Sequence, residues 1–164
     1  MCYCGGMTES LSPDRLAAWR GYIEASQRLL TRLEEDLRAT SNLSLADYHV
    51  LVLLSEVPGQ RLRMGELAER LVFSPSRLTY QISSMQRRGL VARQPCAQDG
   101  RGSEAVLTAA GLLALREAAP QHLHSVRTHL MDDLDDAEIA CLTRIFTRLG
   151  QRLQATASPA HSDS

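Results

Sequence analysis

Residues 64–107 contain two short helix patterns followed by two short strand patterns, an order that restricts the fold more than any other feature. Residues 64–71 place their apolar side chains on one helical stripe. A second helix begins at Ser74 and Pro75, because serine is a preferred N-cap and proline fits the first helical turn. Gly89 ends that helix as a C-cap. Helix, turn, helix and hairpin in this order predict a winged helix-turn-helix.

The hairpin is expected from residues 90–93 and 103–107, two short segments that the loop QPCAQDGRG separates. The loop contains glycine and carries Arg101 near its tip. We therefore expect a two-stranded β wing with a basic tip beside the second helix.

The segment that precedes this motif predicts one long helix. Ser12 is a candidate N-cap, Pro13 suits the first helical position, and apolar residues recur at helical spacing as far as Leu37. A helix over residues 13–39 is about 40 Å long. Because one small core cannot cover that length, we expect a second copy of the chain to cover part of its apolar stripe.

The remaining helices have recognisable starts. Ser44 and Asp47 form a capping-box-like pair before a segment that is apolar nearly all round, which predicts a central helix. Thr108 can cap the next helix, which Pro120 is expected to kink or interrupt. Asp135 and Glu138 form a further capping pair at the start of the last helix. Since aromatic residues make up only 4% of the chain, and Leu, Ala and Arg dominate, the fold class is mostly α.

This pattern divides the chain into five functional segments. The terminal helices carry more apolar surface than one domain can bury, so they are expected to form a homodimer. The expected segments are a flexible N-terminal tail (1–11), an N-terminal dimerisation helix (12–43), a winged helix-turn-helix DNA-binding domain (44–107), C-terminal dimerisation helices (108–156) and a flexible tail (157–164).

The charge distribution indicates double-stranded DNA as the partner. The whole chain has a net charge of −1, but residues 74–102 carry five arginines and one acid, a local charge of +4. Short polar side chains at the start of the second helix can reach base edges, and the arginines can neutralise phosphates or, at the wing tip, enter a minor groove. The candidate DNA-binding residues are Ser74, Ser76, Arg77, Thr79, Tyr80, Gln81, Ser84, Arg87, Arg88, Arg93, Asp99 and Arg101.

The run MGELAERLVFSPSRLTYQISSMQRRGLVARQPCAQDGRGSEAVLTAAG resembles the core of the multiple antibiotic resistance regulator (MarR) family. It shares "LA", a recognition helix that begins with serine, "GLV.R", a "D.R" wing tip and "LT..G", in that order. The resemblance implies that Ser74, Ser76, Thr79 and Tyr80 face DNA, that Arg101 is the wing arginine and that Asp99 helps orient a nearby arginine. Tyr80 stands where the family often has arginine, and Ser83 where it often has aspartate, which predicts altered base readout.

The same resemblance implies a homodimeric transcriptional regulator that binds a palindromic operator: a repressor that a small ligand relieves, with an activator as the alternative. Trp19, Tyr22 and His49 are candidates for the pocket of an aromatic or anionic effector. Core or dimer packing of Trp19, and a partly buried structural histidine at position 49, are the alternatives. Cys96 lies in the wing among arginines, so a redox-responsive regulator that uses this thiol is a further alternative.

Other classes of protein lack support in the sequence. A Gly-rich phosphate loop, a nucleophile elbow and paired catalytic carboxylates are missing, so an enzyme is not expected. Neither a cofactor nor a metal is expected, because the histidines and cysteines lack ligand spacing. No apolar run approaches the roughly 20 residues of a membrane span, which predicts a cytoplasmic protein without a membrane partner. A winged-helix module that binds proteins instead of DNA is the competing function.

Overall fold

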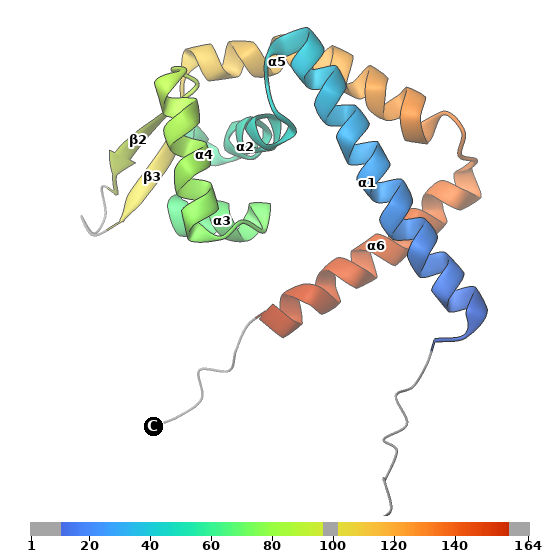
Figure 1. Cartoon of the computed structure of the whole chain (residues 1–164). Coiled ribbons are helices and arrows are strands. Elements are labelled where there is room, and N and C mark those ends of the chain that lie inside the picture. Colours follow the sequence, from blue (N-terminus) through green and yellow to red (C-terminus); the bar gives the residue numbers. More distant parts are fainter. Residues whose placement is uncertain (1–10, 97–101, 158–164) are drawn as a thin grey trace, which may run out of the picture. The chain divides into compact units, whose positions relative to one another are not determined.

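The computed structural model describes residues 11–96 and 102–157 of the chain. The chain divides into two compact units, Met1–Ser125 and Val126–Ser164, which are described separately. The first unit contains most of the helices and the sheet (Figure 1). Its elements are α1 (Pro13–Ser41), α2 (Leu45–Glu56), η1 (Pro58–Gln60), β1 (Arg61–Arg63), α3 (Met64–Leu71), α4 (Pro75–Arg87), β2 (Val91–Pro95), β3 (Ser103–Leu107) and all but the last residue of α5 (Ala109–Val126).

The helix starts follow the capping signals of the sequence. The Ser12 hydroxyl accepts from the backbone N–H of Arg15 at the start of α1. At α2, Ser44 and Asp47 form a complete capping box, each side chain accepting from the backbone N–H of the other, at 2.9 Å in both directions. Each of these bonds satisfies an N–H that the first turn of a helix leaves unpaired. The predicted mostly helical fold is confirmed.

The sheet has three antiparallel strands in the order β1-β3-β2, one more than the sequence predicts. The wing hairpin pairs Val91 with Leu107 at its base and Pro95 with Ser103 at its outer end. The additional strand, β1, pairs Leu62 with Ala105. Its three residues, Arg-Leu-Arg, are too few to display an alternating pattern, and β3 supplies the partner that stabilises them.

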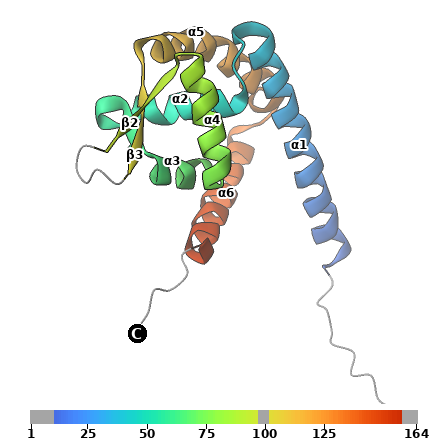
Figure 2. The ribbon, with the colours of Figure 1, turned by 60° about the vertical axis from the view of Figure 1, so that its left-hand side comes forward.

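The core of the first unit surrounds α2. This helix contacts α1, α3, α4 and β3, and Val50, Leu51 and Leu54 on it are fully buried. Figure 2 shows α2 passing behind α4, with α3 below. Ile82 and Met85 complete the core from α4. Because apolar side chains anchor the core-facing side of α4, its opposite side can carry polar residues.

The start of α5 packs tightly against the wing. The Thr108 hydroxyl donates to the carbonyl of Gly89 at 2.7 Å and accepts from the N–H of Gly111 at 2.9 Å. A Cβ atom at Gly111 would lie 2.0 Å from the carbonyl oxygen of Leu90, so only glycine allows this approach. Further along, α5 continues through Pro120 without the interruption that the sequence predicts. Pro120 lies on an exposed face, where water can bond to the carbonyl that proline leaves unpaired.

The second unit consists of a π-helical turn, η2 (Arg127–Met131), and α6 (Asp136–Ala157). Asp135 and Glu138 cap α6 reciprocally, as the sequence predicts. Apolar side chains along α6 are exposed to solvent: Ile139, Ile145, Phe146, Leu149 and Leu153. Within the described part of the chain, no helix combines the length and apolar character that a membrane crossing requires.

Candidate nucleic-acid interface

A tight turn places α4 beside α3. At this turn, Val72 adopts the left-handed conformation, with φ 55° and ψ 42°, and its backbone N–H reaches the last carbonyls of α3. The N–H of Phe73 bonds to the carbonyl of Ala68 at 2.9 Å, which closes the end of α3. Ser74 then caps α4 by accepting from the N–H of Arg77 at 3.3 Å. These local bonds set the angle at which the chain enters α4.

The two faces of α4 differ sharply in burial and polarity. Leu78, Ile82 and Met85 are at most 1% exposed and anchor the inner face. The outer face carries polar side chains and Tyr80, which is 73% exposed. The sequence-predicted site residues that are exposed on this helix and its two caps are Ser74, Ser76, Arg77, Thr79, Tyr80, Arg87 and Arg88. The outer face is therefore available to a partner along the whole helix.

Several of these side chains are held by local interactions. The hydroxyls of Ser74 and Ser76 lie 3.2 Å apart, and Thr79 donates to the carbonyl of Pro75 at 2.8 Å. The guanidinium of Arg77 stacks over the ring of Phe73 at 3.9 Å, a cation–π contact. This contact holds a positive charge at the first turn of α4, where backbone N–H groups also favour anions.

Two predicted site residues, Gln81 in α4 and Arg88 at its C-cap, bond to a buried acid. Gln81 donates from its amide nitrogen to Asp47 Oδ1 at 2.6 Å, and Arg88 donates to Asp47 Oδ2 at 2.7 Å. Arg88 also donates to the backbone carbonyl of Asn42 at 2.7 Å. Ser84 is half-buried on the same side. From the sequence, Asp47 is expected only as a cap, because partners 34 and 41 residues away leave no local signal.

The wing contributes further predicted residues. Arg93 is exposed on β2 and donates to the hydroxyl of Ser103 across the hairpin at 3.0 Å. Asp99 and Arg101 lie outside the described residues. Cys96 is only 3% exposed, and its thiol lies 3.5 Å from a carboxylate oxygen of Glu104. An oxidant in solution reaches such a buried thiol poorly, so the geometry does not favour the redox alternative.

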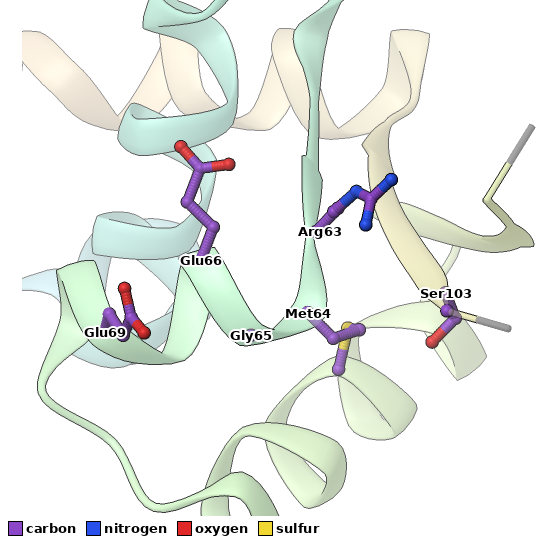
Figure 3. Close-up of a pocket in the computed structure, with 7 residues that line it drawn as sticks. Arg63, Met64, Gly65, Glu66, Glu69 and Ser103 are labelled. Carbon is purple, nitrogen blue, oxygen red and sulfur yellow. The ribbon is translucent and has the colours of Figure 1, made fainter. Parts of the chain in front are cut away.

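A hollow of about 500 Å³ lies between the start of α3 and the outer end of the wing (Figure 3). Figure 3 shows Glu66 and Glu69 on α3, and Arg63 and Ser103 on the side of the sheet. The rest of its lining is Met64, Gly65 and Gly102. Two carboxylates at one edge disfavour a phosphate there, so the outer face of α4 is the better candidate for an anionic partner.

The candidate effector residues lie on two helices of the first unit. Trp19 and Tyr22 form an exposed aromatic pair on α1, with ring centroids 6.1 Å apart. His49 is exposed on α2 beside Tyr48. A buried histidine that the sequence does not single out as an effector residue, His122 on α5, lies against Tyr48 with 4.3 Å between the ring centroids and the rings tilted at 47°. Whether Trp19, Tyr22 and His49 line one pocket stays a prediction.

Comparisons with known proteins agree with this geometry. Residues 41–102 match a model of the MarR family. The chain is similar to AbsC, a MarR family transcriptional regulator from Streptomyces coelicolor, at 38% identity, 90% of this chain, 99% of that chain and a TM-score of 0.85. It is also similar to Sco3205 from the same organism, a MarR family transcriptional regulator solved in complex with DNA, at 32% identity, 95% and 96% coverage and a TM-score of 0.86. A curated relative is the HTH-type transcriptional repressor YetL of Bacillus subtilis (strain 168), 26% identical over 124 residues that cover 76% of this chain and 74% of that protein.

Proposed function

The chain belongs to the MarR family of transcriptional regulators, and on that premise we propose that it binds a palindromic operator as a homodimer and represses transcription until a small ligand relieves it. It is a regulator and not an enzyme. The observation that carries the proposal is the outer face of α4, which is polar, free of acidic side chains and fully separated from the apolar inner face. Such a helix fits the major groove of DNA.

The charges around this face suit a duplex. Arg77 at the start of α4, Arg87 at its end and Arg93 on the wing are all exposed. Such exposed arginines can neutralise phosphates, while Ser76 and Tyr80 on the same helix are candidates to reach base edges. The complex of Sco3205 with DNA, at 32% identity over nearly the whole chain, supports this mode of binding.

Dimerisation is supported by apolar surface that each unit leaves exposed. On α1, which is 29 residues long, Trp19 and Leu30 are each more than half exposed. On α6, five large apolar side chains are exposed within one helix. Association with a second copy would remove both surfaces from water. Two-fold symmetry then requires an inverted repeat, with half-sites about one helical turn apart.

Repression and ligand relief are the finer parts of the proposal. The curated relative YetL is a repressor, which favours the same direction of control here. For relief, a ligand must prefer one spacing of the two recognition helices over the other. The exposed aromatic pair on α1 and the histidine on α2 supply the kind of surface that an aromatic or anionic effector uses.

The proposal is tested by fluorescence anisotropy with a duplex from the region upstream of the chain's own coding sequence. Wild-type protein should bind with an affinity that falls steeply with salt. Arg87→Ala should reduce the slope of log K against log salt by about one for each phosphate that Arg87 neutralises. Arg116→Ala, which removes an exposed arginine from α5, serves as the control and should leave the slope unchanged. A protein-interaction module would show no salt-dependent binding.

A further inference from the structure

Asp47, the third residue of α2 and the acid of its capping box, is unusually buried for that role. Caps normally face water, whereas Asp47 is only 3% exposed and lies beneath α4. Its carboxylate accepts from the backbone N–H of Ser44 in its own turn and from the side chains of Gln81 and Arg88. Burial of a carboxylate is costly unless hydrogen bonds and an opposite charge compensate it. Capping of α2 alone does not require that cost, because an exposed acid would serve equally well.

Gln81 in α4 and Arg88 at its C-cap bind this carboxylate from positions two helical turns apart. Gln81 and Arg88 are seven residues apart, so they lie on one side of the helix and are separated by about 10 Å along its axis. Their side chains converge on the two oxygens of one group, at 2.6 and 2.7 Å. Sliding α4 along its axis, or turning it about that axis, lengthens at least one of these bonds. The carboxylate therefore restrains both movements.

Arg88 extends the network to α1. Its second terminal nitrogen donates to the carbonyl of Asn42, the left-handed residue that ends α1. The surrounding polar hollow of about 360 Å³ includes Arg38 from α1 and Ser84 from α4. The end of α1, the start of α2 and the outer helix α4 thus meet at one buried acid.

From this convergence we propose that Asp47 is a positioning residue, which sets the recognition helix α4 on the α1–α2 junction through Gln81 and Arg88. The proposal rests on the proposed function, because the consequence is specific DNA binding. It also assigns Gln81 and Arg88 a role inside the protein, in addition to any interaction with DNA. A shift of α1 would reach α4 through Asn42 and Arg88.

Electrostatics and positioning predict opposite effects on DNA affinity when the charge of Asp47 is removed. A negative charge close to a DNA-binding surface repels phosphate, so its loss should strengthen binding to every duplex. Loss of positioning should instead weaken only the binding that depends on the fit of α4 to bases. The direction of the change at Asp47 therefore separates the two explanations.

The experiment compares two duplexes of about 30 base pairs, long enough for two half-sites one helical turn apart. One is selected by the wild-type protein from a random library, and the other has the same bases in shuffled order. Asp47→Asn should weaken binding to the selected duplex on the order of tenfold. Binding to the shuffled duplex should not weaken. Circular dichroism establishes that the protein is folded at the assay temperature.

Controls and a double mutant complete the test. Glu35→Gln removes the same charge from an exposed pair with Arg32 and should leave binding to both duplexes unchanged. Arg88→Gln should weaken binding to the selected duplex, as Asp47→Asn does. The variant that carries both substitutions should bind this duplex at least as tightly as the single variant with the lower affinity. If Asp47→Asn does not fold, Gln81→Met, at a half-buried position, removes one of the hydrogen bonds to Asp47 instead. It should weaken binding to the selected duplex and leave binding to the shuffled duplex no weaker.

Three results would overturn the proposal: unchanged or tighter binding of Asp47→Asn to the selected duplex, equal losses on both duplexes, or additive losses in the double variant. The proposed function fails separately, if the wild-type protein selects no duplex from the library.

Discussion

The imidazole of His122 on α5 lies against the ring of Tyr48 on α2, with 4.3 Å between the ring centroids. His122 is 9% exposed, and its Nδ1 is the one buried side-chain nitrogen or oxygen, among the described residues, that lacks a hydrogen-bond partner. Burial lowers the pKa of His122 below its usual value, and the nearby His49 lowers it further. Burial also raises the pKa of the Tyr48 hydroxyl. The folded protein therefore favours a neutral imidazole at this contact.

The first prediction is a loss of stability in mild acid. In the unfolded chain His122 gains its proton near its ordinary pKa of 6.5, but in the folded chain its pKa is lower. The unfolded state thus binds more protons as the pH falls, and the free energy of unfolding decreases below about pH 6.5. Urea unfolding between about pH 8 and 5 measures this slope. His122→Phe should reduce the slope without removing it, because burial also lowers the pKa of His49, while His124→Gln, at an exposed position, should not reduce it. A wild-type stability that is flat across this range contradicts the assignment.

The second prediction concerns strain at the turn between α3 and α4. Val72 holds φ 55°, a conformation that a β-branched side chain rarely adopts, and its side chain is 88% exposed. Val72→Gly should therefore stabilise the protein by about 0.5–1 kcal/mol, since strain is relieved and little packing is removed. Val72→Ala retains a Cβ atom and should increase the free energy of unfolding by less than Val72→Gly does. The midpoint of urea unfolding measures both, and a less stable glycine variant would show that Val72 is not strained.

A third prediction follows from the close approach of α5 to the wing. In Gly111→Ala the new Cβ atom meets the Leu90 carbonyl, and we expect a loss of roughly 2–3 kcal/mol in the free energy of unfolding. The matched control is Gly65→Ala in α3, where no atom lies within 4 Å of the new Cβ. That variant should be at least as stable as the wild-type protein, because alanine has a higher helix propensity than glycine. Equal stability of the two variants would contradict the tight packing.

The fourth prediction tests the dimer. Light scattering of the wild-type protein should report twice the chain mass of 18.1 kDa. Leu149→Glu places a charge on the exposed apolar face of α6 and should shift the mass toward that of a monomer. Thr147→Glu adds the same charge at another exposed position of α6 and should leave the mass unchanged. A monomeric wild-type protein rules out the proposed assembly.

Local signals in the sequence account for much of the fold. Helix starts at Ser12, Ser44 and Ser74 are predicted correctly, because the side chain that caps each helix lies within three residues of the N–H group that it satisfies. The hairpin is also predicted, because a glycine-containing loop separates two short strand segments. The exposed outer face of α4 is predicted because periodicity reports which side of a helix faces the core.

Features that depend on distant parts of the chain could not be read in this way. The strand β1 exists because β3 pairs with it, and its three residues carry no pattern of their own. The inward-pointing bonds of Gln81 and Arg88 require the start of α2 to lie beneath α4, so polarity alone assigns both to the outer face. The ring contact between His122 and Tyr48 likewise joins two helices that are far apart in sequence.

The most direct test of the account asks which duplexes the outer face of α4 selects. In vitro selection from a random library should yield, for the wild-type protein, an inverted repeat with half-site centres about 10 base pairs apart. Because Tyr80 is the most exposed large apolar side chain of that face, Tyr80→Ala should retain the spacing but relax the preference at one position of each half-site. Failure of the wild-type protein to enrich any sequence, or an identical preference in the Tyr80→Ala variant, would contradict recognition by this face of α4.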